Sequence, residues 1–281
     1  MSKKFTKEDV IQNKKESIRF LNKLLESYIN NPSEKHLKKA NILSYWLKDF
    51  AEYIQKEERF DPTKNISYKR GNVVKLNFGF NVGSEYGGLH YGVVLDNKNE
   101  HNSPVLTVIP LTSIKEDKNT HQNSVELGNE LYRLLKLKYD TISKALKDEQ
   151  AEIQDAITAF SVLVEMAGDA INNYHNIDDI DESKKELNKA EKYLSATDKL
   201  ENFWKEKERH NIEQQKYLDK IGLEISRMKE GSIALVNQIT TVSKMRIFDP
   251  RNLKGVLAGI SLSEEKMEQI NQKVKELYVF Q

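Results

Sequence analysis

Three short runs of β-type residues lie in the first half of the chain, at 73–80, 91–95 and 105–110. Val, Ile, Leu and Phe dominate these runs, and Gly, Asn, Pro and Ser bound them, which is typical of strands. One further run of the same kind follows at 232–242. The pattern therefore predicts a small β unit assembled from two separate parts of the chain.

Residues 7–60 instead show apolar positions at spacings of three and four, which predict two helices. Asn31 and Pro32 break the pattern, and Ser33 is the expected cap of the second helix. A last amphipathic helix is expected to begin near Ser263. Its predicted buried face consists of Met267, Ile270, Val274 and Leu277.

Residues 129–229 carry a heptad-like apolar stripe in two stretches, joined by a polar turn at 175–183. Asp181 or Ser183 is the expected cap of the second stretch. Helices of about 45 residues would be about 70 Å long. The polar run 205–215 interrupts the stripe. Two interpretations of this run stay open, a place where the packing loosens and a place where a partner docks.

The composition narrows the class of protein. With a mean hydropathy of -0.67 and 31% charged residues, the 281-residue chain predicts long helices with exposed faces. Its 44 Lys and Arg nearly balance 43 Asp and Glu, so any nucleic-acid site must be local. No cysteine is present, which excludes disulfides and thiolate metal sites. No apolar run reaches the roughly 20 residues of a membrane span, so we expect a soluble, cytoplasmic protein.

The segment between the first two predicted strands is dense in polar side chains. A turn by itself would require only glycine. Here the segment reads Gly83, Ser84, Glu85, Tyr86, Gly87, Gly88, Leu89 and His90. Polar groups gathered in this way indicate a functional site.

Several motifs together resemble those of the MazF/PemK family of toxin endoribonucleases. They are RGNVV at 70–74, VGSEYGG at 82–88, PLTS at 110–113, SVEL at 124–127 and NQITTVSKMR at 237–246. Their order and spacing agree with the family over residues 68–127 and 231–278. Neither the helical N-terminus nor the block 129–229 belongs to the minimal family member.

The resemblance implies an α+β fold built on a small, SH3-like antiparallel β barrel with a C-terminal helix. We expect the barrel to comprise residues 67–128 and 231–281, preceded by an N-terminal helical hairpin at 1–66. Residues 129–230 would form a long antiparallel coiled-coil arm inserted between two barrel strands.

The implied activity is that of a sequence-specific, metal-independent endoribonuclease toxin. Such an enzyme cleaves single-stranded RNA and leaves a 2′,3′-cyclic phosphate and a 5′-hydroxyl, without a cofactor. The resemblance further implies a homodimer in the bacterial cytoplasm and a possible antitoxin protein as partner. Whether the helical additions shield the RNA groove themselves is left open.

The expected catalytic residues are His90, Thr112 and Ser84. In the family, an arginine follows the GG pair and a threonine ends the PxTS strand. Thr112 matches that threonine, whereas His90 occupies the place of the arginine and Tyr91 that of the usual proline. Histidine accepts and donates protons near neutral pH, so His90 is a candidate general acid or base. The alternative is that activity was lost with the arginine, and that His90 fills a turn.

The expected substrate-binding residues could meet bases by stacking or by hydrogen bonds to their edges. Phe78 fits a core position equally well, and Glu85 could orient His90 instead. Lys75, Lys115, Lys244 and Arg246 could contact phosphates. The substrate-binding set is Asn77, Phe78, Glu85, Ser113, Lys115, Gln238 and Thr240.

A function from a different class competes with the nuclease. The chain could be a catalytically silent RNA- or protein-binding module whose coiled-coil arm recruits a partner. The nuclease requires His90 and Thr112, whereas binding by the silent module would survive the loss of His90.

Overall fold

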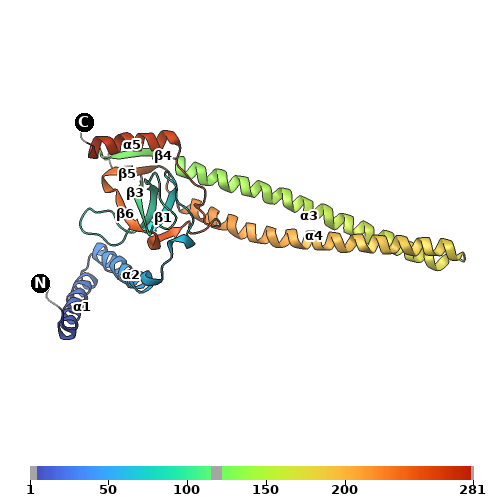
Figure 1. Cartoon of the computed structure of the whole chain (residues 1–281), viewed down its shortest axis with the longest axis horizontal. Coiled ribbons are helices and arrows are strands. Elements are labelled where there is room, and N and C mark those ends of the chain that lie inside the picture. The colour runs from blue at the N-terminus through green and yellow to red at the C-terminus, as the bar shows by residue number, and fades with distance from the viewer. Residues whose placement is uncertain (1–4, 115–121, 280–281) are drawn as a thin grey trace. The chain divides into compact units, whose positions relative to one another are not determined.

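A seven-stranded antiparallel sheet is formed within residues 5–114 and 122–279, the part of the chain that this computed structural model describes (Figure 1). The strand order is β4-β5-β3-β2-β1-β7, and β6 also pairs with β3. The strands are β1 (Val73–Asn77), β2 (Leu89–Val94), β3 (Val105–Ser113), β4 (Ser124–Gly128), β5 (Ser232–Leu235), β6 (Thr240–Ser243) and β7 (Ile247–Asp249).

Apolar side chains from five of these strands, together with Tyr68 before β1 and Phe78 after it, form the core of the sheet. Burying each large aliphatic side chain contributes about 1.5–3 kcal/mol, so this cluster dominates the stability of the β unit. Tyr86 packs against it from the β1–β2 loop. The cluster consists of Tyr68, Val74, Leu76, Phe78, Val94, Leu106, Val108, Val242 and Ile247.

The strand boundaries differ from the prediction in two places. β1 ends at Asn77 rather than at residue 80, because Gly79 has a φ of 96° and turns the chain out of the sheet. The predicted strand 232–242 is split by a 3₁₀ turn at Val236–Gln238. β6 beyond this turn pairs with residues 105–108 of β3.

Three helices accompany the sheet, α1 (Lys7–Ile29), α2 (Glu34–Lys56) and α5 (Glu264–Tyr278). Ser33 is the N-cap of α2, but its side chain makes no capping bond; its carbonyl accepts from His36 and Leu37 instead. α5 begins directly after Ser263, as predicted, and the Ser263 side chain caps it by accepting from the Lys266 N–H. Among the described residues, no helix combines the length and apolar character needed to cross a membrane.

The chain divides into two units, and the second unit, Leu127–Ser232, contains the two longest helices. α3 (Glu130–Asn176) and α4 (Ile180–Arg227) lie side by side along their lengths (Figure 1). The expected cap at Asp181 or Ser183 is wrong by at least two residues. The N-cap is Asp179, whose carboxylate accepts from the N–H groups of both Asp181 and Glu182.

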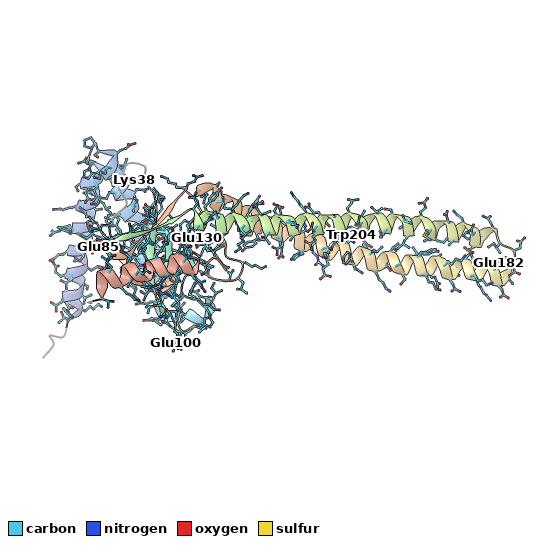
Figure 2. All side chains as sticks on the ribbon, turned by 90° about the horizontal axis from the view of Figure 1, so that it is seen from above. Lys38, Glu85, Glu100, Glu130, Glu182 and Trp204 are labelled. Atoms are coloured by element: carbon cyan, nitrogen blue, oxygen red, sulfur yellow. The ribbon has the colours of Figure 1, made fainter. Side chains whose placement is uncertain are left out.

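The predicted apolar stripe of this hairpin is only partly buried. Figure 2 shows Trp204 near the middle of the hairpin and Glu182 near its tip. Towards the tip, Leu187 and Leu194 keep 41% and 47% of their surface exposed. Small side chains replace them at the helix contact, where Ala167, Ala170 and Ala190 are buried.

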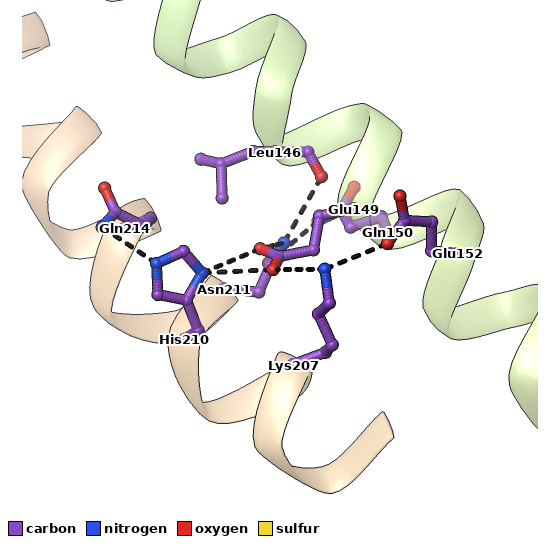
Figure 3. A network of polar contacts seen from close by, with 8 residues as sticks. All are labelled: Leu146, Glu149, Gln150, Glu152, Lys207, His210, Asn211 and Gln214. Carbon is purple, nitrogen blue, oxygen red and sulfur yellow. Dashed lines mark hydrogen bonds and ion pairs between the residues drawn. The ribbon is translucent and has the colours of Figure 1, made fainter. Parts of the chain in front are cut away.

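A polar layer joins α3 to α4 within the run 205–215 that interrupts the stripe (Figure 3). His210 Nδ1 lies 3.1 Å from both carboxylate oxygens of Glu149, and Lys207 Nζ lies 3.6 Å from Oε1. Asn211, which is 8% exposed, donates to the Leu146 carbonyl and to Glu149. The helices are therefore in contact here through hydrogen bonds beside the buried side chain of Leu146.

Glu149 is the common acceptor of this layer. Desolvation acts to raise its pKa, but the hydrogen bond from His210, with Asn211 and Lys207, outweighs it and holds the pKa below the usual 4.5. A carboxylate with a lowered folded-state pKa contributes stability above its unfolded pKa, and the contribution disappears as pH falls through the folded value. Ionised Glu149 therefore stabilises the hairpin at neutral pH.

Glu149→Gln is expected to lower the free energy of unfolding by about 1 kcal/mol at pH 7, because the charged acceptor is lost. Urea unfolding of the full chain, followed by helical circular dichroism, measures this difference. The wild-type advantage should persist down to the unfolded pKa of a glutamate, near 4.5, and disappear as the pH falls further through the lower folded-state pKa. A difference independent of pH would contradict a role for the Glu149 charge.

Candidate functional site

The loop between β1 and β2 is closed by two short backbone hydrogen bonds. The Phe78 N–H donates to the Gly88 carbonyl at 2.8 Å, and the Gly88 N–H donates to the Gly79 carbonyl at 2.7 Å. Gly88 has a φ of 93°, a conformation that glycine adopts without steric cost. These bonds place Leu89 and His90 directly at the start of β2.

Gly87 is required by a close approach of the backbone rather than by its own backbone conformation. Its backbone does not have a positive φ, unlike those of Gly83 and Gly88. A Cβ at position 87 would lie only 2.6 Å from the Gly79 carbonyl oxygen, within the backbone contact that closes the loop. Residue 87 therefore has no space for a side chain.

Two amide side chains hold the loop from within. Gln238 accepts from the Tyr86 N–H at 3.2 Å and donates to the Ser84 carbonyl at 3.4 Å. Asn81 donates to the Tyr86 carbonyl at 2.7 Å. Tyr86 is therefore held by one residue from each of the two sequence segments that make up the β unit.

Tyr86 links the two principal predicted catalytic residues. Its ring centroid lies 4.8 Å from that of His90 and 5.6 Å from that of Phe78. Its hydroxyl donates to the Leu111 carbonyl at 2.8 Å and interacts with the Thr112 side chain. Burial raises the pKa of Tyr86, and the Thr112 hydrogen bond partly offsets the rise, so the phenol stays protonated at neutral pH.

His90 lies on the solvent-accessible end of β2, paired with Leu76 of β1. On the other side of β2, Gly92 pairs with Pro110 of β3 in antiparallel register. His90 lies two residues before Gly92, and Thr112 lies two residues after Pro110. Partial desolvation lowers the pKa of His90 below its ordinary 6.5. The imidazole is therefore mainly neutral at pH 7, which suits a proton acceptor.

Beside Tyr86 lies a pocket of about 360 Å³. Four predicted substrate-binding residues line it together: Phe78, Glu85, Gln238 and Thr240. Phe78 is only 3% exposed, so it serves the core as well as the pocket wall. The other lining residues are Asn81, Tyr86, Pro110, Asn237, Ile239, Val242 and Arg246.

The remaining predicted site residues lie outside this pocket. The Asn77 amide donates to Asp49 of α2 at 2.9 Å and accepts from the Gly79 N–H. Ser84 is exposed on the β1–β2 loop, and Ser113 is half-buried at the end of β3. Lys115 lies outside the described residues. The pocket lining does not include Asn77, Ser84 or Ser113.

Lys244, considered for a phosphate contact, is instead buried at 1% exposure. Its ammonium donates to the carbonyls of Glu100 and His101, at 3.1 and 3.4 Å. Desolvation lowers its pKa, and nearby Asp96 opposes this effect. Lys244 thus secures the segment before β3 rather than facing the solvent.

Tyr86 and the pocket position of Arg246 are the features that the sequence motifs did not single out. Tyr86 stands within the GSEYGG loop, but its spacing reveals nothing of its contact with Thr112. Within the described residues, no cluster of three or more His, Cys, Asp or Glu side chains could hold a metal ion.

Gly87→Ala is expected to destabilise the β unit by about 1–3 kcal/mol, because its Cβ would overlap the Gly79 carbonyl. Gly83→Ala is the matched control. It also lies in the loop, with a φ of 64°, but nothing lies within 4 Å of its Cβ, so only the cost of about 1 kcal/mol for the left-handed backbone applies. Denaturant unfolding compares the two, and equal losses would contradict the close-approach argument.

Comparison with known proteins supports the resemblance read from the motifs. Residues 69–158 match the family model described as PemK-like, MazF-like toxin of type II toxin-antitoxin system. The matched segment contains β1 to β4, the His90 loop and Thr112, and it continues into α3. No curated protein matches the chain. The match confirms the resemblance of this segment, about a third of the chain, to the PemK-like, MazF-like toxins of type II toxin-antitoxin systems.

Proposed function

We propose that this protein is a sequence-specific endoribonuclease toxin that cleaves single-stranded RNA without a metal ion. The observation that carries the proposal is the contact of both His90 and Thr112 with Tyr86, next to a pocket lined by residues suited to base recognition. The products would be a 2′,3′-cyclic phosphate and a 5′-hydroxyl.

In this reaction, neutral His90 accepts the proton of the ribose 2′-hydroxyl, and the 2′-oxygen forms a bond to phosphorus. The bond between phosphorus and the 5′-oxygen then breaks, and the leaving oxygen takes up a proton. The lowered pKa of His90 favours the accepting role, because the imidazole is already unprotonated at neutral pH. An arginine at this position would remain protonated and could not act as the base.

Thr112 is the proposed donor to the phosphorane oxygens, where negative charge develops in the transition state. Tyr86 is well placed to orient it, since the phenol interacts with both the Thr112 side chain and the neighbouring Leu111 carbonyl. Ser84, exposed on the facing loop, is a further candidate donor from the opposite side.

The pocket is the proposed binding site for an unpaired base. Single-stranded RNA is recognised by hydrogen bonds to exposed base edges and by stacking. Glu85 and Thr240 offer polar groups on its wall, and Gln238 is held rigidly by the loop that it clamps. Asn77, Ser113 and Lys115 are proposed contacts for neighbouring nucleotides.

The family match over residues 69–158 also motivates proposals about assembly. We infer an SH3-like barrel composed of residues 67–128 and 231–281, a hairpin at 1–66 and a coiled-coil insertion at 129–230. β5, β6 and β7 lie outside the family match but share one sheet with β1 to β4, which supports a barrel made from both segments. A homodimer, a cytoplasmic location and an antitoxin partner are proposed on the same basis.

Incubation of the full chain with long single-stranded RNA in excess EDTA tests the proposed nuclease. Discrete cuts with 5′-hydroxyl ends are expected. His90→Ala should lower the rate about 10²–10⁴-fold, as loss of a general base does, and Thr112→Val about 10²–10³-fold. Tyr45→Ala, an exposed change on α2, should leave the rate unchanged.

Two outcomes would contradict the proposal. Cuts that require a divalent cation would refute metal independence. Intact RNA that is nevertheless bound equally well by wild type and His90→Ala would favour the catalytically silent binding module.

The dependence of kcat/KM on pH is expected to show an acid limb with a midpoint below 6.5, because desolvation lowers the pKa of His90. Activity should rise with pH as the imidazole loses its proton and becomes able to act as base. Thr112→Val should lower the plateau without moving the midpoint. A midpoint that stays the same in residual His90→Ala activity would assign the limb to another group.

A further inference from the structure

The second helix of the N-terminal hairpin contacts the β unit beside the proposed site. Trp46, Asp49 and Tyr53 lie at spacings of three and four, on one face of α2. Asp49 accepts from the Asn77 amide at 2.9 Å. This face therefore meets the end of β1, where the chain turns at Gly79 into the candidate loop.

Trp46 packs on the guanidinium of Arg246. The guanidinium carbon lies 4.9 Å from the centroid of the indole, a distance typical of a cation–π contact. Arg246 Nη2 donates to the Phe78 carbonyl at 2.8 Å. A Cβ at Gly79 would lie 2.5 Å from Nη2 and 3.0 Å from the indole, so the stack is packed directly against the backbone.

Arg246 keeps donor capacity in this arrangement. Its Nε is buried and has no hydrogen-bond partner, and the Phe78 carbonyl takes one of the two N–H bonds of Nη2. Within the described residues, no carboxylate forms an ion pair with it. Desolvation lowers the pKa of Arg246, and Tyr53 opposes the effect, yet an arginine stays charged at neutral pH.

Arg246 is also the one Lys or Arg among the described residues that line the pocket; the other ionisable lining groups are Glu85 and Tyr86. A cationic donor would stabilise the negative charge of a phosphodiester that enters this pocket. His90 cannot supply the charge when it is neutral. We propose that Arg246 binds an RNA phosphate at the pocket, and that Trp46 of α2 is the positioning residue that holds its guanidinium; this inference rests on the proposed function.

The geometry favours a role for α2 in positioning Arg246 over a role in shielding the pocket from substrate. An indole covers the face of a guanidinium, whereas the N–H donors lie in the guanidinium plane and stay available at its edge. Trp46 itself does not line the pocket, although Arg246 does. The stack and the Phe78 bond thus fix the orientation of the arginine without occupying the space of a substrate.

Two substitutions of Trp46 distinguish the effect of its aromatic face from the effect of its apolar volume. Trp46→Phe retains a π face over Arg246, and Trp46→Leu retains apolar volume without it. We expect Trp46→Leu to weaken binding of single-stranded 2′-O-methyl RNA of mixed sequence about five- to tenfold, the scale of a desolvated cation–π contact. Trp46→Phe should remain within about twofold of wild type.

The salt dependence of RNA binding is a measurement that would not change if Trp46 had only a general structural role. Loss of one phosphate contact lowers the slope of log K against log salt by about one unit. Trp46→Leu and Arg246→Ala should both show this decrease, and their combination should be no worse than Arg246→Ala. In cleavage of RNA, Trp46→Leu should raise KM and leave kcat nearly unchanged.

Tyr45→Ala is the matched control, because Tyr45 is an aromatic residue of the same helix that is 66% exposed. It should bind RNA as wild type does. Tighter binding by Trp46→Leu would overturn the inference and show that α2 shields the pocket. Equal binding by wild type, Trp46→Leu and Trp46→Phe would overturn this inference alone. A wild-type chain that binds no RNA would overturn the proposed function as well.

Discussion

The two backbone bonds that close the β1–β2 loop are the constraint on which the candidate site depends. They join Phe78, Gly79 and Gly88 within a space that excludes a side chain at Gly87. Because unpaired backbone groups are costly when buried, this closure fixes the loop in one conformation. His90 follows two residues later, so its place at the start of β2 results from the closure.

Proton transfer and positive charge are supplied by different residues of the candidate site. Desolvation keeps His90 mainly neutral at pH 7, and burial keeps Tyr86 protonated, so neither provides a full charge for an anionic substrate. Arg246 is held at the pocket between the Phe78 carbonyl and the Trp46 indole. An arginine at position 90 could have supplied charge but not a base, whereas two separate residues can supply both.

The long helical hairpin adds a polar layer to the kind of apolar burial that holds the sheet. α3 and α4 bury Leu135, Leu146, Leu218 and Ile221. They also meet in a polar layer made of Glu149, His210, Lys207 and Asn211. Such a layer contributes less free energy than apolar packing but penalises a shifted pairing, which would leave buried polar groups without partners. The small alanines nearer the tip place few restrictions on register, so we infer that the polar layer specifies the alignment of the helices.

The sequence by itself determined the helices, most strands and the loop that contains His90, because apolar periodicity and glycine-rich turns are local properties. It also indicated the resemblance to the PemK-like, MazF-like toxins, since the motifs at Gly83 to Gly88 and around Thr112 are each short local runs. The sequence did not identify Asp179 as the cap of α4. Asp179, Asp181 and Ser183 can all accept a capping hydrogen bond, and the backbone geometry decides which of them does. Only the tertiary structure decided that Tyr86 joins His90 to Thr112, that Lys244 is buried and that Trp46 lies on Arg246. The last of these contacts joins residues far apart in the chain, and such proximity depends on how the hairpin and strands pack, which no local pattern encodes.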